Sequence, residues 1–127
     1  MPEEIEEGTS LVRTYVLNRS AEDVKLSLII GGIEQTGLSL ITLDDVSIYK
    51  AYPGNLMHEV IGQNNNLGGK KLRVITAVTD TSPNHNDTDL MVLLEGGFVT
   101  NGYKLEKTTE RDGETVIYTV IISFYQF

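Results

Sequence analysis

Apolar and polar residues alternate along most of the chain, which is the period-2 pattern of strands that bury one face. The run at 114–126 is the longest and places five large apolar side chains on one face: Val116, Tyr118, Val120, Ile122 and Phe124. Other runs of this kind lie at 11–17, 24–30, 38–43, 46–52, 72–78, 90–94 and 98–109. The pattern therefore predicts about eight strands, while residues 56–61 fit either a strand or a single helical turn.

Glycine, asparagine and aspartate separate these runs and predict where the chain turns. Gly31-Gly32 and Gly96-Gly97 each suit a tight turn, because glycine tolerates a positive φ. Asp112-Gly113 lies between two alternating runs, which predicts a hairpin. Residues 64–69 (NNNLGG) and the polar stretch 80–89 are predicted to be loops.

An internal repeat relates the two halves of the chain. Residues 24–37 (VKLSLIIGGIEQTG) and 88–102 (TDLMVLLEGGFVTNG) both contain an apolar strand, a Gly-Gly pair and a further glycine. This alignment predicts two pseudo-repeated four-stranded units, 11–69 and 70–127, with chance self-similarity of an all-β chain as the alternative. About eight strands, several with one apolar face, favour a two-layer antiparallel β-sandwich that forms a single domain over residues 11–127.

The composition supports an all-β fold. Only 3 of the 127 residues are alanine, against 35 β-branched residues (11 Val, 11 Ile and 13 Thr). Alanine is the best helix former, whereas β-branched side chains lose χ1 freedom in a helix and pack well on a sheet. The chain has no cysteine, which excludes a disulfide framework, a thiol nucleophile and Cys-ligated metal sites.

The formal net charge of −8 argues against nucleic acid as a partner, because such binding relies on Lys and Arg. Half of this charge comes from Glu3, Glu4, Glu6 and Glu7, so residues 1–10 are predicted to form an acidic flexible tail. The acidic start is the opposite of a secretory signal, and the apolar runs are shorter than the roughly 20 residues of a membrane helix. We expect a soluble cytoplasmic protein without membrane association, although a chain that had lost a signal peptide would read the same way.

The polar stretch 80–89 contains the best candidate metal site. It offers five oxygen-bearing side chains, the kind of ligand that calcium prefers: Asp80, Asn84, Asn86, Asp87 and Asp89. The spacing is not that of an EF-hand, and Asn and Asp are also ordinary turn residues. No cofactor other than calcium is a candidate. This loop makes a carbohydrate- or calcium-binding module the alternative function.

Catalysis has little support in the sequence. Acid–base and nucleophilic mechanisms usually employ histidine, and the chain has only His58 and His85. Neither belongs to a known nucleophile motif. An enzyme is therefore the third choice, and in that case His85 would act with Asp87 and Asp89. His85 and Asn86 are also candidate ligand-binding residues of the polar loop.

The last strand has a second apolar face, formed by Ile121, Tyr125 and Phe127 opposite the core set. Exposed aromatic residues on a strand promote association. This face is therefore covered either by the chain's own loops or by another subunit or protein partner. We predict a non-catalytic binding or assembly module, either a homo-oligomer or a protein that binds a partner, which acts through this sheet face and its loops.

Overall fold

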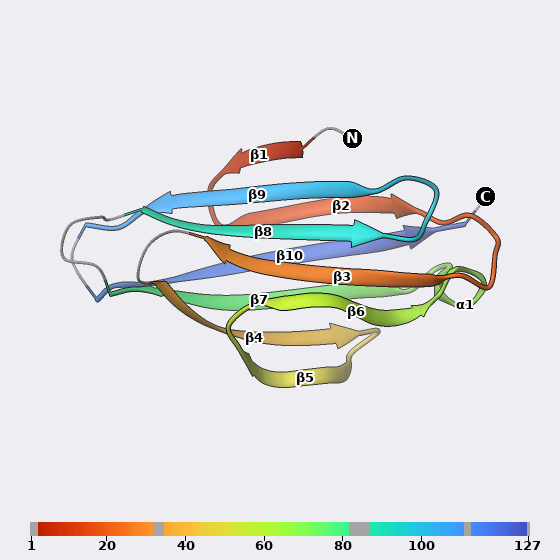
Figure 1. Cartoon of the computed structure of the whole chain (residues 1–127), viewed down its shortest axis with the longest axis horizontal. Coiled ribbons are helices and arrows are strands. Elements are labelled where there is room, and N and C mark those ends of the chain that lie inside the picture. Colours follow the sequence, from red (N-terminus) through yellow and green to blue (C-terminus); the bar gives the residue numbers. More distant parts are fainter. Residues whose placement is uncertain (1–2, 32–34, 82–86, 111–112, 127) are drawn as a thin grey trace.

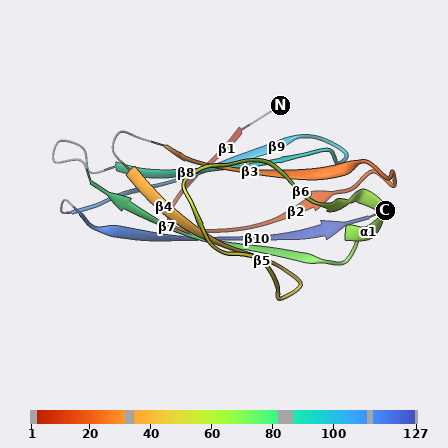
Figure 2. The ribbon, with the colours of Figure 1, turned by 60° about the horizontal axis from the view of Figure 1, so that its bottom comes forward.

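Two β-sheets packed face to face form this protein. The computed structural model describes residues 3–31, 35–81, 87–110 and 113–126, and within them ten strands and one short helix. Each sheet has five strands (Figure 1), and a view turned by 60° separates the two layers (Figure 2). The predicted all-β, two-layer sandwich is confirmed, with ten strands in the described residues in place of about eight.

Sheet A and sheet B are each named here by their strand order. Sheet A runs β1 (Glu3–Glu7), β9 (Asn101–Thr108), β8 (Asp87–Glu95), β3 (Asp23–Gly31) and β6 (Leu56–Gln63). Sheet B runs β2 (Ser10–Val16), β10 (Thr115–Tyr125), β7 (Lys71–Asp80), β4 (Gln35–Leu43) and β5 (Val46–Pro53). Helix α1 (Asn64–Leu67) makes one turn between β6 and β7, within the segment predicted to be a loop.

The first strands of the chain join the two sheets in parallel. Strand β1 pairs with β9, and β2 pairs with β10, whereas the other strand pairs of both sheets are antiparallel. The sandwich is therefore not purely antiparallel. Residues 1–10 also differ from the predicted tail, because Glu3–Glu7 form a strand and Ser10 begins β2. Gly8, with a φ of +135°, lies where the chain passes from one sheet to the other.

Most connections cross between the sheets. Strands β3 and β4 lie in different sheets, as do β9 and β10, so neither Gly31-Gly32 nor Asp112-Gly113 closes a hairpin within one sheet. Those two hairpin predictions are wrong, and Gly32 and Asp112 themselves lie outside the described residues. The turn predicted at Gly96-Gly97 is confirmed, because residues 96–100 join β8 to its antiparallel neighbour β9 within sheet A. Among the described residues, a tight turn within a sheet also occurs at Asp44-Asp45. Both aspartates have positive φ, as a type I′ turn requires, and they join β4 to β5.

The two predicted four-stranded units do not have equivalent topologies. Their third strands are β4 and β9, and these lie in opposite sheets. The polar stretch 80–89 is also shorter than predicted, because Asp80 ends β7 and Asp87 begins β8. Register between distant strands, and not the repeated Gly-Gly pattern, decides which strands pair.

The inward-facing positions of both sheets form one core. On β10 these are the five apolar residues that the alternation predicts, Val116, Tyr118, Val120, Ile122 and Phe124, all buried. On β8, Leu90, Val92 and Leu94 face the core while Met91 and Leu93 are half-buried, which fits its place at the centre of sheet A. The chain's apolar strand faces therefore meet between the layers.

Candidate functional site

The outward-facing side of sheet B is rich in apolar side chains. We call it the outer B face and define it by the outward positions of β2, β10, β7 and β4. Its apolar members are Val12, Val16, Leu38, Leu40, Ile75, Ala77, Ile117, Ile121 and Tyr125. Four of them expose half or more of their surface: Val12 61%, Leu38 52%, Ile117 51% and Tyr125 54%. This is a continuous apolar surface rather than scattered single residues.

Strand register builds this surface in rows that run across the sheet. One row joins Ile117 on β10, Ala77 on β7 and Leu38 on β4. The next row joins Thr119, Ile75 and Leu40. Because directly paired residues on neighbouring strands point to the same side, each row forms a band across the outer B face.

A third row is longer and carries a cation. It joins Val12 on β2, Ile121 on β10, Arg73 on β7 and Thr42 on β4. Lys71 follows at the same end of β7, and its backbone N–H donates to Asp44 Oδ1 at 2.8 Å. The positive charge of the outer B face is thus gathered toward one end of the strands, with the Asp44-Asp45 turn beside it.

The two sheets carry opposite formal charge. The strands of sheet A contain ten carboxylates and three lysines, a formal charge of −7. The strands of sheet B contain one carboxylate and four cationic side chains, a formal charge of +3. The one carboxylate is Asp80, which is fully buried. The outer B face therefore has no carboxylate, in a chain with 18 acidic residues.

The residues predicted to contact a partner lie on this surface. Ile121 is half-buried and Tyr125 is 54% exposed, both on the outward side of β10. Phe127 lies outside the described residues. The described loops leave Tyr125 and Ile117 uncovered, so they do not bury this face.

Sequence reasoning missed the members of the outer B face on other strands. Val12, Leu38 and Ile75 come from three different strands, and only the pairing of β2 and β7 with β10, and of β4 with β7, brings them together. One signal was present in the sequence. The run at 72–78 has apolar residues, Ile75 and Ala77, on its second face as well as on its core face.

Three of the five candidate metal ligands, Asp80, Asp87 and Asp89, lie in the described residues, and these three do not form one cluster. Asp80 is fully buried, and its Oδ2 accepts a hydrogen bond from Thr109 Oγ1 at 3.3 Å. Asp87 is exposed at the start of β8, where its Oδ1 accepts from Thr108 Oγ1 at 3.0 Å. Asn84 and Asn86 lie outside the described residues. Across the part of the chain that the structure describes, no group of three or more His, Asp or Glu side chains is arranged to hold a metal ion.

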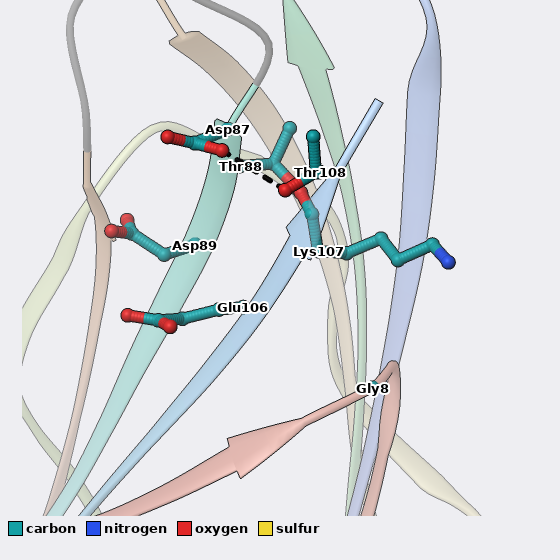
Figure 3. A pocket seen from close by; sticks show the side chains of 7 residues that line it. All are labelled: Gly8, Asp87, Thr88, Asp89, Glu106, Lys107 and Thr108. Carbon is teal, nitrogen blue, oxygen red and sulfur yellow. Dashed lines mark hydrogen bonds between the residues drawn. The ribbon is translucent and has the colours of Figure 1, made fainter. Parts of the chain in front are cut away.

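Asp87 and Asp89 instead lie in the lining of an open pocket of about 580 Å³, together with residues of β8 and β9 and with Gly8. Figure 3 shows their carboxylates and that of Glu106 on the same side of the strands, with Lys107 pointing the other way. Lys104 lies beside them, with its Nζ 3.2 Å from Glu106 Oε1 and 3.8 Å from Asp89 Oδ2. An adjacent cation thus offsets part of the pocket's negative charge.

His58 does not line this pocket, and His85 lies outside the described residues. His58 on β6 has its Nδ1 2.7 Å from Glu95 Oε1 on β8, and its backbone N–H donates to Ser27 Oγ at 2.9 Å. It has a positive φ of +53° in an irregular stretch of β6. His85, the predicted catalytic or ligand-binding residue, lies outside the described residues, as does Asn86.

Within the described ranges, no helix is long and apolar enough to cross a membrane. The chain matches no protein-family model, no curated protein and no solved structure. Its function must therefore be argued from the two faces of the sandwich themselves.

Proposed function

We propose that this protein is a non-catalytic binding and assembly module that contacts another protein through the outer B face. The observation that carries the proposal is an apolar, carboxylate-free surface on one side of a chain whose net charge is −8. Interface cores are depleted in charged residues and enriched in aromatic and apolar ones. The outer B face has this character, and the outer side of sheet A does not.

A contrast between the two outer faces supports the choice of surface. The outer side of sheet A displays Asp87, Asp89, Glu95 and Glu106, with Lys25 and Lys104 between them. Apolar side chains also lie on this side, among them Met91, Leu93 and the exposed Val60, but they are interspersed with these charged residues, which water solvates. Exposure of an apolar sheet face to water, by contrast, costs about 25 cal/mol per Å² of apolar surface, which favours burial of such a face against a partner.

Site-specific photo-cross-linking in cells tests the proposal. A photoreactive phenylalanine analogue is placed at Leu38 or Ile117 on the outer B face. The matched controls are Met57 and Val60 on β6 of sheet A, which are 52% and 46% exposed. We expect discrete higher-mass adducts from the two outer B face positions and none from the two controls. The proposal fails if no position gives an adduct, or if the control positions give adducts of equal yield.

A further inference from the structure

We propose that the outer B face is occupied by a second copy of this chain, packed face to face in a twofold dimer. The inference rests on the proposed function and adds the identity and orientation of the partner. In an isologous dimer the same patch on both copies must be self-complementary. The outer B face meets this condition in its centre, where apolar and threonine side chains would contact their own equivalents.

The charge distribution favours this packing over the alternatives. Stacking through sheet B places the layers in the order A, B, B, A, so the two sheets of formal charge −7 lie farthest apart and stay in water. Contact between two A sheets would bring their carboxylates together. Head-to-tail contact of sheet A on sheet B would bury Asp87, Asp89 and Glu106 against apolar side chains, which carries a desolvation penalty.

The ends of the outer B face select the direction of the twofold axis. In a face-to-face dimer the axis lies in the plane between the two sheets. An axis along the strands would place Lys71 and Arg73 over the same residues of the other copy. An axis across the strands at the row of Thr119 places Lys71 over the partner's Thr79, at the end where the exposed Glu114 lies, and places Arg73 over the partner's Ala77. The structure therefore favours the axis across the strands.

The size of the face suits a small dimer interface. Its four strands, spaced about 4.8 Å apart, are about 19 Å wide, and the eight steps from Lys71 to Thr79 span about 27 Å. The projected area is therefore about 510 Å², below the roughly 800 Å² that each partner buries in a standard interface. Because each sheet is twisted, the strands of the two facing B sheets should cross at about 30°, as in other aligned sheet packings.

Light scattering and sedimentation of the purified chain test the identity of the partner. We expect the measured mass to rise with protein concentration and to reach twice 14.1 kDa by about 1 mM. The double variant Leu38→Lys/Ile117→Lys should weaken dimerisation by roughly 100-fold, because it adds cations to the row that lies over the partner's Arg73 in the proposed orientation, while its circular dichroism stays unchanged. The control Met57→Lys/Val60→Lys, at exposed positions on sheet A, should remain dimeric.

Disulfide cross-linking tests the orientation, since the chain has no cysteine of its own. Ile117 and Ile121 lie one row to either side of the row of Thr119. With the axis across the strands, a mixture of the Ile117→Cys and Ile121→Cys variants should form disulfide dimers more readily than either variant alone. An axis along β7 places β10 over the partner's β4, so the mixture then forms disulfide dimers no more readily than either variant alone, and this result overturns the orientation.

Other outcomes overturn the choice of partner. A monomer at all concentrations, a mass that keeps growing with concentration, or a dimer that Leu38→Lys/Ile117→Lys leaves intact each contradicts the twofold dimer. If the cellular adducts at Ile117 have a mass other than twice that of the chain, the second copy is wrong while the proposed binding surface stands. If no adducts form and the chain is monomeric, both fail.

Discussion

Thr88 and Tyr118 form a polar bridge between the two sheets across the apolar core. The Tyr118 hydroxyl lies 2.7 Å from Thr88 Oγ1 and donates to the Thr88 carbonyl oxygen at 3.0 Å. Thr88 Oγ1 also donates to the Lys107 carbonyl oxygen at 2.8 Å. Both residues are buried, so these groups satisfy one another without water. The bridge ties β10 of sheet B to β8 and β9 of sheet A.

Removing the phenolic hydroxyl should destabilise the sandwich. Tyr118→Phe keeps the ring but deletes the contacts to Thr88, and a lost buried hydrogen bond costs about 1–2 kcal/mol. Urea unfolding followed by circular dichroism measures the loss. Tyr125→Phe is the matched control, because Tyr125 is 54% exposed on the outer B face and should change stability by less than about 0.5 kcal/mol. Equal losses in the two variants would contradict the role of the bridge.

Buried tyrosines should make the fold sensitive to alkali. Burial raises the pKa of Tyr118 and of Tyr15 above the ordinary value of 10.0. Below about pH 10 the phenols are neutral in both states, so stability is unaffected there. Above it the unfolded chain loses these protons more readily, and the free energy of unfolding falls by up to about 1.4 kcal/mol per pH unit for each such tyrosine. Urea titrations from about pH 8 to about pH 12 check this, with Tyr118→Phe flattening the decline.

Local patterns predicted strand faces well but not strand neighbours. The alternation on β10 identified its five core residues because side chains on a strand alternate between faces, whatever the rest of the fold. The outer B face was only partly foreseen, because Val12 meets Ile121 through a parallel pairing more than a hundred residues apart in sequence. Gly31-Gly32 read as a hairpin, since local flexibility does not reveal whether a chain turns within a sheet or crosses to the other.

The acidic strand β1 shows that local sequence patterns can also miss a strand. Glu-rich segments have low strand propensity and read as solvated tails. Strand β1 exists in the structure through its backbone pairing with β9, a tertiary contact that the sequence of residues 3–7 does not encode by itself. The three described candidate metal ligands, Asp80, Asp87 and Asp89, do not form one cluster for a related reason. Asp80 and Asp87 are close in sequence, but one ends a strand of sheet B and the other begins a strand of sheet A.

We expect Asn64 to stabilise the packing of α1 beside the turn between β8 and β9. Its Nδ2 donates to the carbonyls of Glu22 at 2.9 Å and Gly96 at 2.8 Å, and its Oδ1 accepts from the Asn18 N–H at 3.0 Å. Asn64 is fully buried, so Asn64→Ala leaves these partners without it and should cost about 2–3 kcal/mol. Thermal and urea unfolding measure this. Asn65→Ala, at the exposed neighbouring position, should change stability little, and a comparable loss there would contradict a specific role for the buried hydrogen bonds of Asn64.

Gly96 should tolerate substitution far less well than Gly113. Both have positive φ, +94° and +78°, so alanine is strained by about 1–2 kcal/mol at either position. At Gly96 a Cβ would also lie 2.0 Å from the Asp23 carbonyl oxygen, whereas at Gly113 nothing lies within 4 Å. Gly96→Ala should therefore lose at least about 3 kcal/mol or fail to fold, and Gly113→Ala should remain folded. Similar losses, measured by urea unfolding, would show that backbone strain alone governs both sites.

Calcium should not stabilise this protein. Asp80 is buried against Thr109, Asp87 bonds to Thr108, and Asp89 lies beside Lys104. A site with a Kd of about 0.1 mM would add about 1.4 kcal/mol in about 1 mM calcium, enough to raise the Tm by several degrees. We expect no such rise in melting curves recorded with calcium and with a chelator. A rise that Asp87→Asn abolishes, while the stability of the metal-free chain is unchanged, would instead establish the polar stretch as a calcium site.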